Sequence, residues 1–200
     1  TLFRSNADYV YVLDEGQIIE EGSYKLLVNK SGSQLKKMVA KQTLWTISII
    51  LLHKVLITGV TGFIGSHLAE LCVEKGLDVV AFDRYNPDNH WGWLENSNYK
   101  NDMKVILGDI RDYDSVYKAM KGCSAVFHLA ALIGIPYSYV SPLAYIRTNI
   151  EGTYNVLQAA RGLGVNNLVI TSTSETYGTA QSVPINENHH LVGQSPYSAS

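Results

Sequence analysis

Short apolar runs alternate with helical patterns along the chain from residue 54 onward. Five runs of β-branched and aliphatic residues are expected to form strands, over 54–58, 79–82, 104–107, 125–129 and 167–171. Between these runs, apolar residues recur at helical spacing, over 63–75, 112–120 and 141–161. Strands that alternate with helices pair in parallel and are joined by right-handed crossovers. The pattern therefore predicts an α/β fold with an open, doubly wound parallel sheet.

The first fifty residues follow a different pattern. Two short apolar runs on either side of Asp14-Glu15-Gly16 predict a β-hairpin, and short helices are expected over 23–27 and 34–41. No phosphate loop, acid pair or nucleophile beside a base occurs in this stretch. We therefore expect residues 1–52 to be an appended segment without a function of its own, followed by a separate domain over 53–200.

Composition and charge exclude several classes of protein. A formal net charge of −2 argues against partners bound through bulk charge, such as nucleic acid or a membrane surface. The longest apolar stretch, 44–52, is well short of the roughly 20 residues that span a bilayer. Cys72 and Cys123 form neither a disulfide framework nor a metal-ligand pattern, so no metal is expected. A reducing compartment, the cytoplasm, is the expected location.

Three glycines follow the first strand of the second segment directly. Gly59 would permit a tight strand-to-helix turn, Gly62 would let the backbone approach a pyrophosphate, and Gly65 would let the helix pack closely on the strand. The backbone amides of the first helical turn, with Phe63 and Ile64, would then face the phosphates. Strand, glycines, helix and strand in this order predict a dinucleotide-binding domain of the Rossmann type.

An acid stands at the end of the second strand of this domain. Asp83 is placed to accept hydrogen bonds from the ribose diol of a dinucleotide. Its carboxylate would also repel the 2′-phosphate of NADP, so NAD is the expected cofactor. Arg84, the next residue, could partly reverse that preference.

Ligands of open α/β sheets bind at the carboxyl ends of the strands. The loops there are therefore expected to share one crevice, and they cover 59–65, 83–96, 108–112, 129–140 and 172–178. Two runs rich in hydroxyl groups, Thr171–Gly178 and Ser195–Ser200, are the candidates for chemistry. His128 is expected to be a packed residue, and Trp91 and Trp93 either line the site or pack their loop against the sheet.

By these motifs the chain resembles the extended short-chain dehydrogenases/reductases, the NAD-dependent epimerase/dehydratase family. The resemblance covers about residues 54–200 and rests on Thr58-Gly-Val-Thr-Gly-Phe-Ile-Gly65, Gly108-Asp-Ile110, His128-Leu-Ala-Ala131, Asn149-Ile-Glu-Gly-Thr153 and Tyr197-Ser-Ala-Ser200. It implies that Asp109 and Ile110 hold the adenine. It further implies that Leu129, Ala130 and Ala131 line the cofactor's path, and that Thr148 lies near the nicotinamide-side ribose.

The resemblance also implies catalytic roles. Thr173 would hydrogen-bond the 4-hydroxyl of a nucleotide sugar, and Tyr197 would remove the proton of that hydroxyl while hydride passes to NAD. The family pattern has a Lys four residues after the Tyr, at position 201. Without it, a tyrosine with a pKa near 10 is ionised to only about one part in a thousand at pH 7. We therefore expect the 200-residue chain to be an inactive fragment, truncated within the fold and without its substrate domain, whose parent forms a homodimer.

The triplet Thr173-Ser174-Glu175 narrows the reaction. It resembles the nucleotide-sugar 4,6-dehydratases, in which Glu175 would take the C5 proton and Ser174 would help protonate the departing 6-hydroxyl. The segments around it look most like dehydratases that act on UDP-N-acetylglucosamine. The same triplet appears in UDP-glucuronate decarboxylases, and a 4-epimerase needs no such base. Both remain alternatives, as does a catalytically silent NAD-binding module.

Residues 5–42 resemble the C-terminal tail of an ABC-transporter ATPase domain. The matching segments are Ser5-Asn-Ala-Asp8, Tyr11-Val-Leu-Asp-Glu-Gly16 and Ile19-Glu-Glu-Gly22. The family's phosphate loop, signature motif and catalytic acid are missing, so no ATP binding is implied. Read-through from an upstream gene is our hypothesis for this segment, and a native hairpin extension is the alternative.

Overall fold

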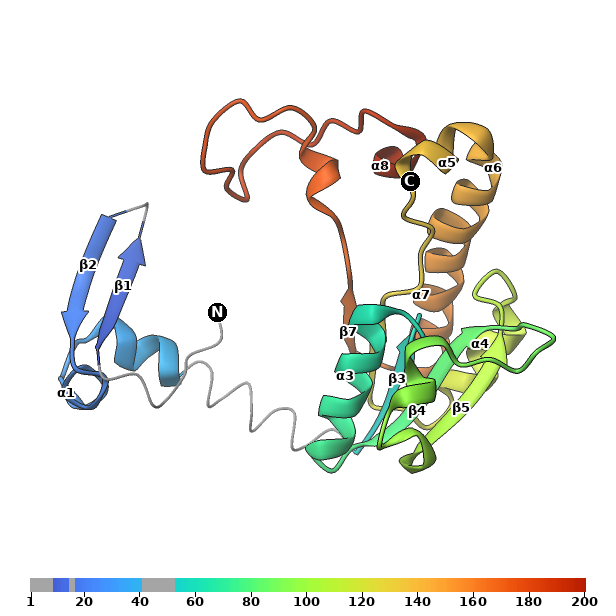
Figure 1. Ribbon diagram of the computed structural model, residues 1–200, viewed down its shortest axis with the longest axis horizontal. Coiled ribbons are helices and arrows are strands. Elements are labelled where there is room, and N and C mark those ends of the chain that lie inside the picture. Colours follow the sequence, from blue (N-terminus) through green and yellow to red (C-terminus); the bar gives the residue numbers. More distant parts are fainter. Residues whose placement is uncertain (1–8, 15–16, 41–52) are drawn as a thin grey trace. The chain divides into compact units, whose positions relative to one another are not determined.

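The computed structural model describes residues 9–14, 17–40 and 53–200 (Figure 1). The chain divides into two compact units, Thr1–Leu51 and Leu52–Ser200, which are considered separately. Four expectations fall wholly or partly outside the described residues: the segment before residue 9, the turn at 15–16, the end of a helix at residue 41, and the apolar stretch 44–52. No helix among the described residues is long and apolar enough to cross a membrane.

The first unit contains a β-hairpin followed by two short helices. Strand β1 (Val10–Asp14) pairs antiparallel with β2 (Gln17–Gly22), and helix α1 (Tyr24–Asn29) follows. A second helix is described over 34–40. One face of the hairpin is buried against the helices, where Val12, Leu27 and Leu35 form a small core. The expected hairpin and helices are therefore present.

Glu20 ties the hairpin to the second helix. Its Oε2 accepts hydrogen bonds from the Ser33 hydroxyl at 2.8 Å and from the Leu35 amide at 3.0 Å. These bonds hold the pKa of the Glu20 carboxyl below its usual range. The Ser33 hydroxyl in turn accepts from the Lys36 amide at 3.2 Å, so the start of this helix is capped twice. Ser23, in contrast, precedes α1 without a capping bond from its side chain.

The second unit is built on a five-stranded parallel sheet. Its strands are β3 (Lys54–Thr58), β4 (Asp78–Arg84), β5 (Met103–Gly108), β6 (Ala125–His128) and β7 (Asn167–Ile170). Their order is β5-β4-β3-β6-β7, and every neighbouring pair is parallel. The order turns back between β3 and β6, which defines the switch point of a doubly wound sheet. The prediction of a Rossmann-type α/β fold is confirmed.

Helices connect the strands along both faces of this sheet. They are α3 (Phe63–Glu74), α4 (Tyr113–Met120), α5 (Ile135–Val140), α6 (Pro142–Tyr145), α7 (Gly152–Leu163) and α8 (Pro196–Ala199). Single turns occur at η1 (Gly92–Asn96), η2 (Lys100–Asp102), η3 (Ile146–Glu151) and η4 (Ser174–Tyr177). The segment 129–140, expected to be a loop, contains α5.

The expected single helix over 141–161 is more complex. It consists of α6, the π-helical turn η3 and α7, and it ends at Gly164, whose φ is +70°. A π-helical turn contains an extra residue relative to α-helical spacing, and such turns occur often at functional sites. Hydrophobic periodicity could not reveal this insertion.

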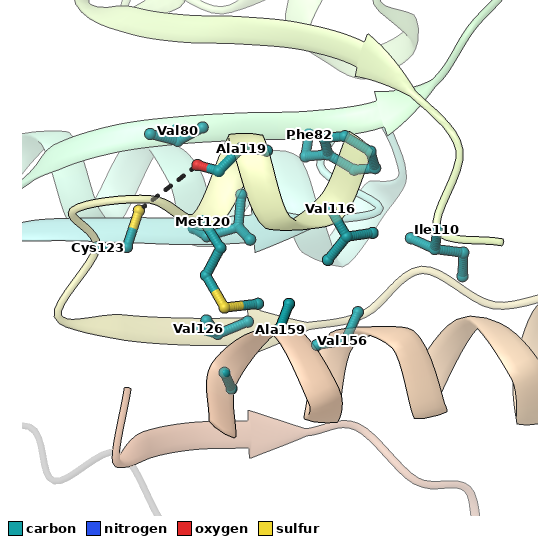
Figure 2. Packing of buried hydrophobic residues seen from close by; sticks show 12 residues of the cluster. Val80, Phe82, Ile110, Val116, Ala119, Met120, Cys123, Val126, Val156 and Ala159 are labelled. Atoms are coloured by element: carbon teal, nitrogen blue, oxygen red, sulfur yellow. Dashed lines mark hydrogen bonds between the residues drawn. The ribbon is translucent and has the colours of Figure 1, made fainter. Parts of the chain in front are cut away.

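The main core lies between the sheet and the pair α4 and α7 (Figure 2). Alternate strand residues point into it, and Phe82 and Val126 are about 1% exposed. Met120 and Val156 from the two helices pack among them. Helix α3 contributes no member to this cluster and packs through Ala69 and Cys72, in keeping with a connection over the opposite face. Beyond the carboxyl ends of the strands, Ile110 after β5 belongs to this cluster and Ala130 after β6 packs against it.

Candidate cofactor site

The glycine turn after β3 is shaped by close backbone contacts. Gly59 has a φ of +71°, and a Cβ on it would lie 2.7 Å from the Ala130 nitrogen. A Cβ on Gly65 would collide with the carbonyl oxygen of Gly59, while one on Gly62 would lie 3.3 Å from that oxygen. The turn therefore presses against the end of β6 on one side and against the start of α3 on the other.

The first turn of α3 is open. Gly62 precedes the helix without a side-chain cap, and Phe63 and Ile64 are 60% and 61% exposed. The first amides of a helix have no partner within it and carry the positive end of its dipole. Such a turn, with a glycine at its entrance, can accept a phosphate group.

The Asp83 carboxylate lies beside this turn and is already partly engaged. Its Oδ2 accepts hydrogen bonds from the amide and the hydroxyl of Thr61, both at 2.7 Å, and its Oδ1 accepts from the Arg84 amide at 2.6 Å. A carboxylate has about four lone-pair positions, so roughly one remains for a further donor. Thr61, which sequence reasoning did not single out, therefore orients Asp83.

A cavity of about 390 Å³ opens at this end of β4. It is lined by residues of the glycine turn, of β4 and of the loop that follows: Thr61, Asp83, Arg84, Asn86, Asp88, His90 and Gly92. All of these residues lie in the segments 59–65 and 83–96, which were expected to share a crevice at this edge of the sheet. Which members of the longer loop line it was not predicted, because that depends on the loop's tertiary contacts.

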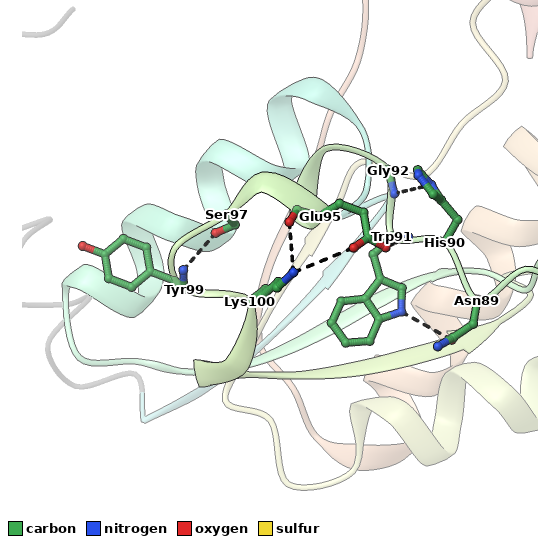
Figure 3. Close-up of polar contacts among 8 residues, drawn as sticks. All are labelled: Asn89, His90, Trp91, Gly92, Glu95, Ser97, Tyr99 and Lys100. Carbon is green, nitrogen blue, oxygen red and sulfur yellow. Dashed lines mark hydrogen bonds and ion pairs between the residues drawn. The ribbon is translucent and has the colours of Figure 1, made fainter.

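The loop between β4 and β5 holds its shape through its own polar groups (Figure 3). The Trp91 amide donates to Glu95 Oε1 at 2.9 Å, and Lys100 Nζ donates to the Glu95 carbonyl at 3.1 Å. The Gly92 amide donates to His90 Nδ1 at 2.9 Å. The loop thereby presents the cavity with a fixed wall.

Trp93 joins this loop to α3. Its amide donates to the Thr61 carbonyl at 3.0 Å, and its ring meets the Phe63 ring edge-on at a centroid distance of 5.3 Å. A Cβ on Gly92 would lie 2.5 Å from that same carbonyl oxygen. Of the two sequence interpretations for the tryptophans, packing of the loop describes Trp93, whose side chain nevertheless remains 56% exposed.

The next strand end carries Asp109 and Ile110. The Arg111 guanidinium, 2.9 Å from Asp109 through its Nε, holds the pKa of that carboxyl below its usual range. The Ile110 side chain is buried in the main core, where a Cβ on Gly152 would lie 2.6 Å from it. An adenine contact from Ile110 would therefore have to come mainly from its backbone, and the roles of both residues stay predictions.

The end of β6 is fixed by Thr58. The amides of Leu129 and Ala130 both donate to its Oγ1 at 3.2 Å. Leu129 and Ala130 are partly buried, and Ala131 is exposed. All three residues were expected to line the cofactor's path. The structure places the backbone of Leu129 and Ala130 against the glycine turn.

Asn149 holds the segment that follows. Its Oδ1 accepts from the Leu132 amide at 2.9 Å, and its Nδ2 donates to the Leu132 carbonyl at 3.0 Å and to the Ser200 hydroxyl at 2.9 Å. Asn149 lies in η3, next to Thr148, which is half-buried. The sequence motif around Asn149 was recognised, but this clamp was not predicted.

The expected catalytic residues come together in two adjacent short elements. Thr173 precedes η4 and accepts from the Glu175 amide at 3.3 Å, while Ser174 and Glu175 are exposed. Tyr197 lies in α8, which packs against η4, α5 and α6, and its ring is 6.2 Å from that of Tyr145. The four side chains therefore lie in neighbouring elements, and their roles stay predictions.

The second unit is similar in sequence to known nucleotide-sugar enzymes. Residues 56–200 match the family model described as GDP-mannose 4,6 dehydratase. A UDP-glucose 4-epimerase of Rhizobium leguminosarum bv. trifolii is 37% identical over 150 residues, which are 72% of this chain and 42% of that protein. A UDP-N-acetyl-alpha-D-glucosaminuronate decarboxylase of Bacillus cytotoxicus is 37% identical over 127 residues, which are 62% of this chain and 37% of that protein. The chain thus spans less than half the length of these relatives.

Solved structures agree with this assignment. The UDP-glucose 4-epimerase of Brucella ovis in complex with NAD has a TM-score of 0.63 at 30% identity, over 74% of this chain and 44% of that one. TunA, an NAD-dependent NDP-hexosamine 5,6-dehydratase, has a TM-score of 0.60 at 30% identity, over 74% of this chain and 46% of that one. Because its match covers more than half of its length, the chain belongs to the GDP-mannose 4,6 dehydratase family, a group of NAD-dependent epimerases and dehydratases of the extended short-chain dehydrogenase type.

Proposed function

We propose that residues 53–200 form the NAD-binding part of a nucleotide-sugar 4,6-dehydratase. The observation that carries the proposal is the open first turn of α3 beside the Asp83 cavity, at the carboxyl ends of β3 and β4. The Brucella ovis relative was solved with NAD, and it shares this fold over three quarters of the chain. A nicotinamide cofactor bound here would take up a hydride and return it.

The residues at the site fit a dinucleotide. A side chain at Gly59 or Gly65 would close the space that the turn keeps for the backbone, so both glycines serve the shape of the turn. The amides of Phe63 and Ile64 would bind the diphosphate. Asp83 would accept one ribose hydroxyl at its remaining lone pair, while Arg84 lines the same cavity.

Substrate chemistry would come from η4 and α8. Thr173 would orient the 4-hydroxyl of the sugar and Tyr197 would accept its proton. Glu175, which is exposed in η4, would remove the proton at C5, and Ser174 would supply a proton to the leaving 6-hydroxyl. After loss of water across C5 and C6, the hydride would return to C6 and a proton from Glu175 would return to C5, which leaves a 4-keto-6-deoxy sugar and restores NAD.

The carboxylate of Glu175 favours the dehydratase over a 4-epimerase, which needs no base at C5. The second candidate is the 4-epimerase, because the UDP-glucose 4-epimerase of Rhizobium leguminosarum is 37% identical to this chain. UDP-glucuronate decarboxylation is a further alternative, since a decarboxylase is equally similar over a shorter stretch. A nucleotide sugar is the shared substrate class of all three.

The reaction is tested by mass. The gene product that carries these residues is incubated with NAD and UDP-N-acetylglucosamine, and the product is analysed by mass spectrometry. A 4,6-dehydratase gives a product lighter by one water, whereas an isomer of unchanged mass would replace the proposal by a 4-epimerase. E175Q should abolish the loss of water and leave NAD binding within about twofold, because the carboxylate lies in η4 and not in the cavity at Asp83.

Cofactor binding is tested on the chain itself. Isothermal titration should give saturable binding of NAD, and D83N should weaken it about tenfold, because a bond to a charged acceptor is replaced by a neutral one. D88N is the matched control, since Asp88 lines the same cavity from the loop that follows β4. Equal NAD affinities of wild type and D83N would refute the ribose contact.

We also propose that the protein forms a homodimer through α6, η3 and α7. Apolar residues on the exposed side of this helix follow one stripe, Leu143, Ile146, Ile150, Tyr154 and Leu157. The stripe positions have the same spacing on both sides of Ile150, as a two-fold antiparallel contact requires, with Ile146 facing Tyr154. Arg147 and Glu151, exposed beside it, give it both signs of charge.

A symmetric contact makes a specific prediction for cross-linking. I150C should form a disulfide-linked dimer, because residue 150 would face its own copy. L143C should not cross-link alone and should do so when mixed with L157C. The native thiols Cys72 and Cys123 are buried and do not interfere. A monomer by light scattering at high protein concentration would refute the dimer.

A further inference from the structure

A buried histidine lies at the switch point of the sheet and has no role in the chemistry above. His128 is the last residue of β6 and is only 3% exposed. Its Nδ1 lies 2.7 Å from Thr58 Oγ1 on β3, and its Nε2 lies 3.0 Å from Thr153 Oγ1 on α7. It therefore joins three elements that meet below the candidate cofactor site.

The hydrogen bonds around Thr58 fix the protonation state of this ring. Thr58 Oγ1 accepts from the Ala130 amide and from the Leu129 amide, which it shares with the Thr58 carbonyl oxygen at the same distance of 3.2 Å, so both of its lone pairs are engaged. Its single proton must then point to His128 Nδ1, which accepts it. A neutral ring carries its proton on the other nitrogen, so Nε2–H donates to Thr153 Oγ1. Burial lowers the pKa of His128 to about 4, which agrees with a neutral ring.

The same bonds control the wall of the site. Ala130 lies against the glycine turn, since its nitrogen would be 2.7 Å from a Cβ on Gly59. Removing the acceptor at Nδ1 would free the Thr58 hydroxyl to rotate, and the Ala130 amide would lose its fixed partner, whereas the Leu129 amide would keep the Thr58 carbonyl oxygen. His128 reaches the glycine turn only through Thr58, and not by direct contact.

We propose that His128, held as the neutral Nε2–H tautomer between Thr58 and Thr153, is a positioning residue that fixes the Leu129–Ala130 backbone against the glycine turn of the cofactor site. This proposal rests on the proposed function only in taking NAD as the cofactor that binds at the site. The tautomer and the backbone geometry are properties of the chain itself.

The tautomer is tested without any cofactor. In a ¹⁵N-labelled chain at pH 7, the long-range ¹H–¹⁵N spectrum of the His128 ring should show an unprotonated Nδ1 and a protonated Nε2. The H128N spectrum identifies the signal by its absence. A ring protonated at Nδ1, or one in rapid exchange between tautomers, would overturn the proposal.

Two substitutions separate positioning from simple filling of the core. In H128N the side-chain oxygen can accept from Thr58 at the place of Nδ1, whereas in H128Q the amide nitrogen reaches toward Thr153 at the place of Nε2. Both variants lose one hydrogen bond, but H128N also lacks one methylene more than H128Q in a buried site, so H128N should have the lower melting temperature. H128Q should weaken NAD binding about fivefold more than H128N, the value of one lost hydrogen bond.

The outcomes are distinguishable. Equal NAD affinities of the two variants, or weaker binding by the less stable H128N, would overturn the positioning role and leave a structural histidine. If the wild-type chain itself does not bind NAD, the proposed function fails, while the nitrogen spectrum still decides the tautomer. If one of the two variants does not fold, the other identifies the His128 signal, and the wild-type spectrum remains the deciding measurement.

Discussion

Lowering the pH from 7 to 5 should destabilise the second unit through His128. In the folded unit its pKa is about 4, whereas an exposed histidine titrates near 6.5. Between these values the unfolded chain binds a proton that the folded unit does not bind. Stability is therefore complete above pH 6.5 and is lost as the pH falls toward 4.

The two pKa values set the size of the effect. Their difference corresponds to about 3 kcal/mol over the whole range, of which about 2 kcal/mol is lost between pH 7 and pH 5. This loss is a large fraction of the free energy of unfolding of an ordinary domain, which is roughly 5–15 kcal/mol. It should be visible as a shift of the midpoint of urea unfolding.

The assay follows the second unit alone. Trp91 and Trp93 belong to this unit, so in a W45F background tryptophan fluorescence reports its unfolding and not that of the first unit. Carboxylates such as Asp109, whose pKa is lowered, also contribute to acid sensitivity. H128N retains these carboxylates and lacks the imidazole, so the comparison isolates His128.

Wild type should lose about 2 kcal/mol more than H128N between pH 7 and pH 5. The free energies of unfolding should therefore converge as the pH falls. Parallel curves for the two proteins would refute the reasoning, because they would mean that His128 binds its proton equally in the folded and unfolded states.

Three further substitutions test other contacts. G59A should lower the free energy of unfolding in urea by about 3 kcal/mol, because φ is +71° and the new Cβ meets backbone. G76A should lower it by only about 1 kcal/mol, because its φ of +77° is similar but the space around it is open. E20Q should speed hydrogen exchange of the Leu35 amide at pH 7, with the difference from wild type vanishing as Glu20 is protonated in acid; unchanged exchange would exclude the cap. N149D replaces the Nδ2 group, which donates to the Leu132 carbonyl, by a second acceptor, and should lower the free energy of unfolding by about 2 kcal/mol. A smaller loss for N149D than for N149A would contradict the clamp.

The sheet was predictable because its signals are local. Apolar runs such as 54–58 and 125–129 coincide with β3 and β6 to within a residue, and glycines occur where the backbone adopts positive φ or close contacts. These local signals do not themselves show that the strand order turns back between β3 and β6. That expectation came from the general rule that alternating strands and helices form a doubly wound parallel sheet. The resemblance to a family supplied the remaining expectations.

The contacts that shape the site were not predictable in the same way. Thr61 reaches Asp83, and Thr58 reaches His128, only after two strand ends have been brought side by side. The loop 83–96 was expected beside the glycine turn, but the close approach of Gly92 to the Thr61 carbonyl within it was not. Their residue types fit many other positions equally well, so no periodicity singles them out.

The π-helical turn η3 makes the long helix sensitive to its own length. Because a π-helical turn holds one residue more than an α-helical turn, deleting one residue within Ile146–Glu151 would restore ordinary α-helical spacing and leave α6 and α7 nearly in the same orientation. Val156 and its neighbours would stay in the core, and the change would be confined to the turn in which Asn149 grips the Leu132 peptide group. The supernumerary residue therefore widens the helix locally at Asn149, and its removal would disturb this grip without emptying the interior.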